Sequence, residues 1–443
     1  MPGTVRFYTL GCKVNQYDSE AMLEAFLARG YEPAPPGVPA DVYVVNTCTV
    51  TGTGDQKSLK AARRYKRQNP GGELVLAGCL AQRMGERLRD TGARLILGTQ
   101  YRARVAELLE QAVAQQTQLV AVDSLQAAPF EALTVHAHEG HTRAVMKIQE
   151  GCDNRCSYCI IPSVRGPVRS KPVKQIEEEA QTLTAAGYQE LVLTGIHLTS
   201  YGRELPDRPT LTDVLAALDG VPGVRRIRLG SLEPMAIDER FVDALKGLHT
   251  LCPQFHLALQ SGSDAVLGRM RRRYDTARYR AAVARLREAC PGAALTTDVI
   301  VGFPGETEAE FAQTVAFCRE IGFMRLHVFP YSRRDGTPAA AMEGQVPEQV
   351  KEERVRRLIA AGEEMAAAYR EVLLGAVRPV LLEERLDDGC LSGYTPEYVQ
   401  VTCAQGTPGQ ILNLRLIAVT KEGMAGEPVE IMQGNAVPNK EDA

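Results

Sequence analysis

The sequence predicts an α/β protein with three parts: an N-terminal parallel α/β domain, a partial (β/α)6 barrel and a small C-terminal antiparallel β-barrel. Three observations support this prediction. Apolar runs alternate with amphipathic helical stretches over residues 1–120, a second alternating series starts at Ala144, and residues 372–436 break into short apolar runs separated by Gly, Pro and Asp. A chain of 443 residues also exceeds what one hydrophobic core usually organises.

The first part contains four apolar runs, each followed by a helical pattern: TVRFYTL, VYVVN, ELVLAG and RLILG. This alternation is typical of a parallel sheet with helices on its faces. We expect this domain to span residues 1–120. The polar stretch 121–138 has no clear period and is expected to be an interdomain linker.

The second part, residues 139–371, contains six apolar runs that alternate with helical patterns: VMKIQ, LVLTG, VRRIRLG, FHLALQ, LTTDVIVG and MRLHVFPY. Right-handed crossovers curl such a sheet, and six units fit an incomplete barrel better than a closed eight-fold one. Chemistry is then expected at the carboxyl ends of the strands. A long charged helix from Pro347 to Leu374 leads out of the barrel towards the last domain, residues 372–436.

The composition is ordinary for a globular protein: 44% of residues are hydrophobic and 24% are charged, which excludes a largely disordered chain. No apolar run approaches the ~20 residues of a membrane span, and the N-terminus lacks a signal-peptide pattern. We therefore expect a cytoplasmic protein without a membrane partner. The net charge of -3 gives no general attraction to polyanions, so a nucleic-acid surface has to come from local clusters.

Three of the 11 cysteines, Cys152, Cys156 and Cys159, follow the first barrel strand in the segment EGCDNRCSYCIIPSVRG. A cubane iron-sulfur cluster has four irons and usually four cysteine ligands, so a three-cysteine loop leaves one iron open to a small molecule. An open position is typical of catalytic metal sites. A structural zinc site is the alternative, but it needs a fourth Cys or His, and none follows Cys159 closely.

Another three cysteines, Cys12, Cys48 and Cys79, each lie just past the end of a predicted strand. Because the carboxyl ends of parallel strands meet at one edge of a sheet, we expect these thiols to lie together and to bind a second cluster with one open iron. Free thiols, reactive or buried, are the alternative. The remaining cysteines share no close spacing and are expected to be packing residues: Cys252, Cys290, Cys318, Cys390 and Cys403.

The cysteine spacing, with Tyr158 just before the third cysteine, resembles the radical S-adenosylmethionine superfamily. The motifs GCKVN (residues 11–15), NTC (46–48) and AGC (77–79) add a resemblance to the methylthiotransferases that covers essentially the whole chain. This resemblance implies two 4Fe-4S clusters, one that carries or activates sulfur and one that cleaves S-adenosylmethionine to a radical. A second S-adenosylmethionine supplies the methyl group, so that a methylthio group is inserted at an unreactive C-H bond.

The resemblance also suggests contacts to the cofactor at the barrel rim. Tyr158 and the backbone of Val301 are expected near the adenine, and Gln260 is expected near the ribose or the methionine. Ordinary packing at strand ends is the alternative for all of these residues. The other rim residues that we expect to contact the cofactor are Thr194, Gly195 and Ser261.

Two basic clusters favour RNA over a protein substrate, because phosphate neutralisation dominates nucleic-acid affinity. A solvated surface helix is the alternative. The C-terminal domain, with the stretch GYTPEYVQV, resembles the small RNA-binding β-barrel (TRAM) that ends many methylthiotransferases, but its four basic and eight acidic residues argue against strong electrostatic binding there. The clusters are Lys57, Lys60, Arg63, Arg64, Lys66 and Arg67, and then Arg269, Arg271, Arg272 and Arg273.

The motifs GCKVN, LTGIHLTSYG and QSGSDAVLGRMRRRY most resemble the bacterial branch that modifies carbon 2 of threonylcarbamoyladenosine beside the tRNA anticodon. The implied partners are the anticodon stem-loop of tRNA and an electron donor and a sulfur donor of unknown identity. Three alternatives stay open: isopentenyladenosine in tRNA, an aspartate of a ribosomal protein, and a non-catalytic iron-sulfur RNA-binding protein. His136, His138 and His141 are expected in a plain solvated loop rather than a metal site.

Overall fold

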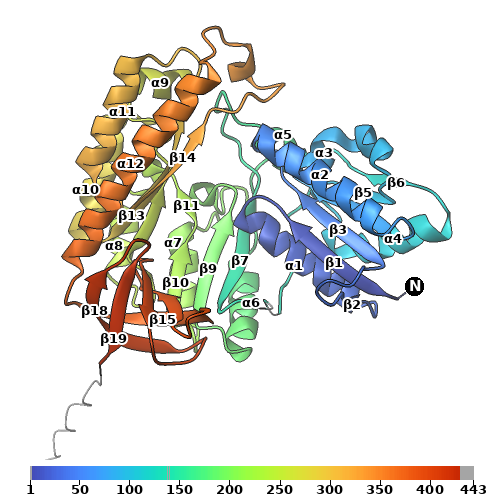
Figure 1. The fold of residues 1–443 in the computed structure, drawn as a ribbon, viewed down its shortest axis with the longest axis horizontal. Helices are drawn as coiled ribbons and strands as arrows, with labels where there is room; N and C mark the ends of the chain where they lie inside the picture. The colour runs from blue at the N-terminus through green and yellow to red at the C-terminus, as the bar shows by residue number, and fades with distance from the viewer. Residues whose placement is uncertain (1, 137, 139, 430–443) are drawn as a thin grey trace, which may run out of the picture.

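The structure is a computed structural model that describes residues 2–136, 138 and 140–429 (Figure 1). It contains an N-terminal α/β part, a curled central β/α part and a C-terminal β-barrel below the central part in this view. The three-part fold class predicted from the sequence is therefore confirmed. Within the described residues, no helix is long and apolar enough to cross a membrane.

The N-terminal sheet has six parallel strands in the order β2-β1-β3-β4-β5-β6, with helices on both of its faces. Helices α1 and α4 pack on one face, and α2 and α3 pack on the other. The two shortest edge strands, β2 and β6, were not expected, because two or three residues show no period. The bounds are β1 Thr4–Thr9, α1 Lys13–Leu27, β2 Glu32–Pro33, β3 Val42–Thr47, α2 Gly52–Gln68, β4 Glu73–Gly78, α3 Cys79–Met84, β5 Leu95–Leu97, α4 Val105–Ala114 and β6 Leu119–Ala121.

The central part is an open barrel made of two four-stranded sheets, β10-β9-β7-β8 and β11-β12-β13-β14, which meet at a single bridge between Ile227 and Leu251. All six predicted strand and helix units are present. The strands are β7 Arg143–Glu150, β8 Arg169–Ser170, β9 Glu190–Gly195, β10 Arg226–Leu229, β11 Ser231–Leu232, β12 Gln254–Leu257, β13 Ala294–Val301 and β14 Arg325–Pro330.

Helices cover the outside of this barrel and bury one large apolar core against its strands. Several begin at a side chain that caps the first turn; Thr307 and Glu310, for example, form a reciprocal capping box at the start of α11. The helices are α5 Ile161–Arg165, α6 Val173–Ala185, α7 Leu211–Asp219, α8 Glu239–Leu245, α9 Asp264–Arg269, α10 Thr276–Ala289, α11 Glu308–Ile321 and α12 Glu348–Val372. Short 3-10 turns span Gly85–Thr91, Arg102–Arg104, Leu198–Ser200, Pro234–Ala236 and Pro338–Ala341.

The C-terminal barrel closes in the order β15-β16-β17-β19-β18, around a small apolar core of its own. The expectation of a fully antiparallel barrel is wrong at one place, because β17 and β19 pair in parallel. Five strands cannot alternate direction all the way round a closed ring, so one parallel pair is unavoidable. The bounds are β15 Val377–Arg385, β16 Leu391–Tyr394, β17 Gln400–Cys403, β18 Ile411–Val419 and β19 Met424–Pro428.

Candidate active site

The loop that carries Cys152, Cys156 and Cys159 directly follows β7 and is pinned by backbone hydrogen bonds. The Cys152 amide donates to the Gly166 carbonyl at 3.0 Å, and the Ser157 amide donates to the Met270 carbonyl at 3.0 Å. Gly151 turns the chain with φ +75, and a Cβ added there would lie 1.8 Å from the Pro167 carbonyl oxygen. The three cysteines border one cavity of about 150 Å³.

A buried ion pair lies against this cysteine set. Arg272 donates to the Cys156 sulfur at 3.1 Å and to Glu233 at 2.6 Å, while the side chains of Asn154 and His197 also approach Glu233, each at 3.1 Å. Burial opposes ionisation of Glu233, but the hydrogen bond from His197 and the charge of Arg272 outweigh it and lower the pKa of Glu233 to about 2. The site therefore holds a permanent carboxylate beside the thiols.

This arrangement corrects one expectation, because Arg272 was assigned to an RNA-contacting basic cluster. Its side chain is only 6% exposed. The sequence RMRRRY places four arginines close together, but only the fold decides which of them points inward. Arg271 and Arg273 are exposed, and Arg269 is paired with Glu310 at 2.9 Å.

Cys12, Cys48 and Cys79 lie where β1, β3 and β4 end, as expected from the pattern of strands. Cys12 precedes α1, and Cys79 is the first residue of α3. Gly11 has φ +100, and a Cβ added to it would lie 3.1 Å from the Cys48 sulfur, so glycine lets the two cysteine segments approach.

Two asparagines of the sequence motifs tie these strand ends together. The Asn15 side chain donates to the Thr47 carbonyl at 3.0 Å, and the Asn46 side chain donates to the Asn15 carbonyl at 2.8 Å. Both side chains are fully buried. The motifs GCKVN and NTC therefore have a physical explanation: each asparagine satisfies backbone groups of the other segment and fixes the spacing of the cysteines.

Cys79 is the most enclosed thiol of this set. Burial raises the pKa of Cys79 to about 11, against the opposing charge of Arg165, whose Nε donates to the Cys79 sulfur at 3.1 Å. Burial also raises the pKa of Cys48, of Cys152 to about 11 and of Cys159 to about 12. Thiols in such surroundings bind as thiolates only when a metal takes the place of the proton.

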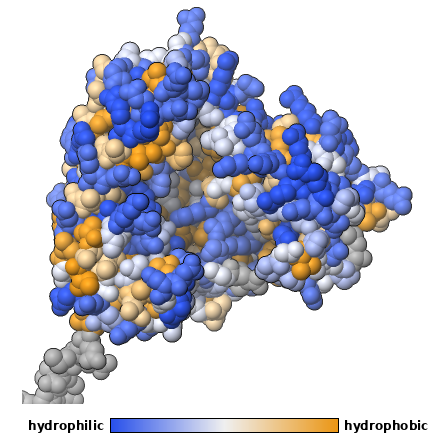
Figure 2. Space-filling model, in the orientation of Figure 1, coloured by the Kyte–Doolittle hydropathy of each residue, from blue (hydrophilic) through white to orange (hydrophobic). Residues whose placement is uncertain are grey.

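The two cysteine sets open into a shared cavity of about 450 Å³. Cys12 and Cys48 line it from the N-terminal part, and Cys159, Tyr158 and Gln260 line it from the barrel. Figure 2 shows the surface hollowed between these two parts of the molecule. Chain segments far apart in the sequence therefore present thiols to one enclosed space.

The donor set suits iron-sulfur clusters. Within the described ranges, no three His, Cys, Asp or Glu side chains converge where one metal ion would sit. Five of the six cysteines instead border cavities, which suits ligands of a multi-iron cluster because each thiolate binds a different iron. The sixth, Cys79, lies buried beside them and interacts with Cys12 and Cys48.

The residues expected to contact the cofactor divide into two groups. Tyr158 and Gln260 line both cavities. Gln260 has φ +68, and its backbone forms hydrogen bonds with the backbone of Asp298 and Ile300 in β13. The others are packed behind the cavity walls. Neither cavity is lined by Thr194, Gly195, Ser261 or Val301. The Ser261 hydroxyl instead forms a hydrogen bond with the Thr314 hydroxyl at 3.2 Å.

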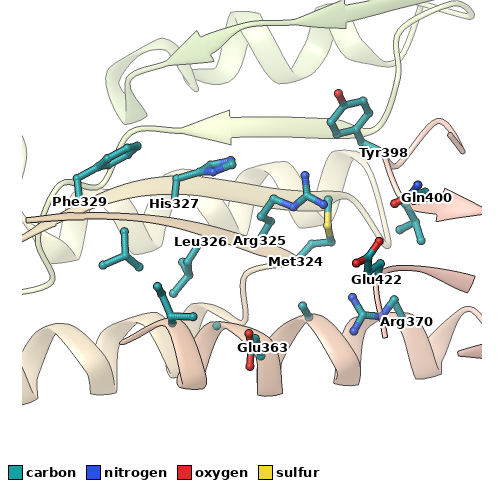
Figure 3. A pocket seen from close by; sticks show the side chains of 15 residues that line it. Met324, Arg325, Leu326, His327, Phe329, Glu363, Arg370, Tyr398, Gln400 and Glu422 are labelled. Carbon is teal, nitrogen blue, oxygen red and sulfur yellow. The ribbon is translucent and has the colours of Figure 1, made fainter. Parts of the chain in front are cut away.

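A groove leads from the C-terminal barrel towards the shared cavity along β14 (Figure 3). It encloses about 390 Å³ between β14, α12 and the C-terminal barrel. Arg325, His327 and Phe329 alternate along the strand and are its more exposed positions, and Phe329 is 45% exposed. Phe329 also lines the shared cavity, so this residue borders both the groove and the cavity.

The remaining expectations concern histidines and cysteines away from the cavities. His138 is buried against Glu20, and its ring meets Tyr188 edge-on at 5.7 Å, so a solvated loop is wrong for this residue. The segment packs back onto α1, which its polar sequence did not indicate. His136 is largely exposed and pairs with Glu24. Cys252, Cys318 and Cys403 are buried, whereas Cys290 and Cys390 are half-buried.

The site residues that sequence reasoning missed are charged groups with distant partners. Glu233 follows β11, Arg272 follows α9, and Arg165 ends α5. Arg165 and Arg272 lie within the quoted motifs, but their spacing did not indicate a contact to a cysteine of another segment. Glu233 lies outside those motifs and reaches Cys156 only through Arg272. A buried charge beside a thiol is visible only once the fold brings the segments together.

Three cysteines in the loop after the first strand of an incomplete β/α barrel define the class of radical S-adenosylmethionine enzymes. In agreement, residues 146–318 match the Radical SAM superfamily, and residues 4–98 match the Uncharacterized protein family UPF0004. Among solved structures, a cobalamin-binding radical S-adenosylmethionine methyltransferase, TsrM from Kitasatospora setae, has a TM-score of 0.55 at 14% identity and covers 77% of each chain. This likeness supports the fold alone.

The chain belongs to the family of radical S-adenosylmethionine methylthiotransferases. It is 43% identical to the threonylcarbamoyladenosine tRNA methylthiotransferase MtaB of Bacillus subtilis, over 95% of this chain and 94% of that protein. The protein of the same description from Thermotoga maritima is 35% identical over 97% and 98% of the two chains. A tRNA-2-methylthio-N(6)-dimethylallyladenosine synthase of Syntrophobacter fumaroxidans is 35% identical over 95% and 94%. The chain is thus an enzyme of a family that uses a 4Fe-4S cluster and S-adenosylmethionine.

Proposed function

We propose that this enzyme inserts a methylthio group at carbon 2 of N6-threonylcarbamoyladenosine next to the tRNA anticodon. The observation that carries the proposal is the shared cavity, which both cysteine sets line. Insertion of a methylthio group needs C-H activation and sulfur delivery at one substrate atom, so the two sites have to face the same space. The choice of substrate rests on the similarity to the Bacillus subtilis protein.

We assign a first 4Fe-4S cluster to Cys12, Cys48 and Cys79, and a radical cluster to Cys152, Cys156 and Cys159. The chemistry that these groups supply when bound is sulfur delivery at the first and reductive cleavage of S-adenosylmethionine at the second. In each set, three thiols leave one iron for a ligand other than cysteine. The proposed domain boundaries, 1–120, 121–138, 139–371 and 372–436, place one set in each of the first and third segments.

The chain's own residues prepare the radical site in three ways. Arg272 holds the Cys156 sulfur and is itself held by Glu233. The Glu233 carboxylate lines the cysteine cavity and stays ionised, so it can accept hydrogen bonds from a cationic group of the cofactor. Tyr158 and Gln260 line both cavities and would position the cofactor between them.

The packed rim residues act differently in this proposal. They line neither cavity and would support from behind the residues that do: Thr194, Gly195, Ser261 and Val301. Apolar side chains exclude water from the shared cavity, which protects a radical from side reactions. These are Val50, Ile160, Ile161 and Ile300.

The proposed RNA surface includes the exposed side of α2. Lys57, Lys60, Arg63 and Arg67 are exposed there, whereas Lys66 is held by the Gly72 carbonyl at 3.0 Å. Arg64 lies over the rings of Tyr8 and Tyr65. The helix begins shortly after Cys48. Its first residue, Gly52, donates a backbone hydrogen bond to Ser332, and both Cys48 and Ser332 line the shared cavity. Phosphates bound along α2 would therefore bring RNA to the mouth of the cavity.

The groove along β14 would extend the RNA surface towards the C-terminal barrel. Arg325 and Arg370 offer cations, and Phe329 offers a ring (Figure 3). Phe329 also borders the shared cavity. Aromatic rings of this kind stack on unpaired bases of RNA loops. The other partners, a cytoplasmic electron donor and a sulfur donor, are of unknown identity.

Anaerobic reconstitution with iron and sulfide tests the proposal. Reductant, S-adenosylmethionine and threonylcarbamoylated tRNA are then added, and the nucleosides are analysed by mass spectrometry. A product heavier by one methylthio group is expected. A product only on isopentenyladenosine tRNA, or only on a ribosomal-protein aspartate, would move the substrate to that alternative. Cluster binding without cofactor cleavage would support a non-catalytic RNA-binding protein instead.

A further inference from the structure

Arg165 belongs to the barrel but contacts the cysteine site of the N-terminal part, and so links the two sites. It ends α5, in the segment that follows the radical cysteines, yet its guanidinium reaches into the N-terminal part of the protein. There its Nε donates to the sulfur of Cys79 at 3.1 Å. The side chain is fully buried. A residue of the barrel therefore touches a cysteine of the other site.

Two carboxylates, one from each part of the protein, fix this guanidinium. Its Nη1 donates to Asp18 of α1 at 2.9 Å and to Glu150 at the end of β7 at 2.6 Å, and its Nη2 donates to the Asn15 side chain. An arginine guanidinium is always charged, so Arg165 is a fixed cation. Four of its five N-H groups donate to side chains of Cys79, Asp18, Glu150 and Asn15.

The contact to Cys79 is also shielded from water. Ile160, which precedes α5, and Val164, which lies within it, form a small apolar cluster with Cys79. In such surroundings the dielectric constant is low, so a cation and an N-H donor act strongly on a nearby sulfur. Within the described residues, no arginine side chain donates a hydrogen bond to Cys12 or Cys48.

We propose that Arg165 is a positioning residue through which the barrel completes the first cluster site and raises the reduction potential of that cluster. A charged N-H donor on a ligand sulfur stabilises the reduced, more negative state, and hydrogen bonds to sulfur are known to set cluster potentials. The inference rests on the proposed first cluster. Its consequence is that the two sites are coupled: the segment behind the radical cysteines sets the electronic state of the sulfur site.

The test uses the full chain with Cys152, Cys156 and Cys159 all changed to Ala, so that only the first cluster is present. Arg165→Gln is compared with this parent by redox titration followed by electron paramagnetic resonance. We expect about four irons per chain in the parent and a clear negative shift of the potential in the variant. Arg165→Lys, which keeps the charge but not the planar donor, is expected to shift the potential less.

The matched control is Arg102→Gln. Arg102 is also buried and pairs with the same carboxylates, Asp18 and Glu150, but in the part of the chain that the structure describes it donates no hydrogen bond to a cysteine. We expect it to disturb packing as much as Arg165→Gln and to shift the potential less. An unchanged potential in Arg165→Gln, or an equal shift in Arg102→Gln, would overturn the inference.

A second measurement needs no substitution of Arg165. In the triple-alanine parent grown with ¹⁵N-labelled arginine, electron-nuclear double resonance should detect a ¹⁵N coupling to the reduced first cluster. Absence of that coupling would overturn the inference even if Arg165→Gln failed to fold. A parent that binds no iron-sulfur cluster would instead overturn the proposed first cluster, and the inference with it.

Discussion

The radical cysteine set and the N-terminal cysteine set each bring three thiols together, but the chain does so in two different ways. Cys152, Cys156 and Cys159 lie close together in the sequence, in one loop that backbone hydrogen bonds to Gly166 and Met270 pin in place. Cys12, Cys48 and Cys79 come from three strand ends, which meet only when the sheet has formed. The comparison teaches that one site is encoded locally and the other by topology. The N-terminal cysteine set also contacts a residue of the neighbouring domain, Arg165.

The largest expected effect comes from removing one cysteine of each set. Cys156→Ala should abolish cleavage of S-adenosylmethionine, because the radical set then holds only two thiols. Cys48→Ala should spare cleavage but stop formation of the methylthio product. Deoxyadenosine and modified nucleoside are measured in the same reaction. Equal loss of cleavage in the two variants would contradict the division of labour between the sites.

The second effect concerns the buried pair behind the radical set. Glu233→Gln leaves the Arg272 charge without its carboxylate and should reduce the free energy of unfolding by about 3 kcal/mol at pH 7. The folded pKa of Glu233, about 2, lies below its ordinary value of 4.5, so the ionised group stabilises the fold above pH 4.5 and this stabilisation is lost as the pH falls towards 2.

Urea unfolding of the apoprotein at pH 7 and at pH 3 measures this difference. The difference in free energy of unfolding between wild type and Glu233→Gln should become smaller at the lower pH. Lys246→Gln serves as the control, because its partner Asp243 is exposed and the pair contributes little. A difference that stays constant with pH would show that folding does not lower the pKa of Glu233.

The third effect concerns RNA binding by α2. Changing Lys57, Lys60 and Arg63 together to Gln should weaken tRNA binding at low salt and reduce the slope of log Kd against log salt by about 3, since each phosphate contact contributes roughly 0.9. Lys174→Gln, an exposed lysine on α6, is the control. Filter binding at several salt concentrations checks both. An unchanged slope would remove α2 from the RNA surface.

The smallest expected effect comes from the groove. Phe329→Ala removes the ring that borders both the groove and the cavity and should raise the KM for tRNA about tenfold, since stacking on one base contributes about 1–3 kcal/mol. Cleavage of S-adenosylmethionine without tRNA should not change. Val372→Ala, an exposed apolar residue outside the groove, is the control. A KM equal to that of the control would argue against a base at this position.

The same local and topological contrast explains what the sequence alone could predict. Strand and helix alternation predicted both α/β parts. The cysteine spacing predicted the radical set, and the position of Cys12, Cys48 and Cys79 just after predicted strands predicted the N-terminal set. Two-residue strands such as β2 and β8 could not be predicted, because their pairing depends on neighbouring strands rather than on their own sequence pattern. The burial of Arg272 and His138 was missed for the same reason: their acidic partners, Glu233 and Glu20, lie far away in the chain.

The central claim is that both cysteine sets bind iron-sulfur clusters. Iron and acid-labile sulfide, counted in protein purified without oxygen, test it most directly. About eight irons are expected in the wild type, and about four in each variant that has one complete set changed to Ala. Zinc in place of iron, or about four irons that are all lost when Cys152, Cys156 and Cys159 are changed, would contradict the account.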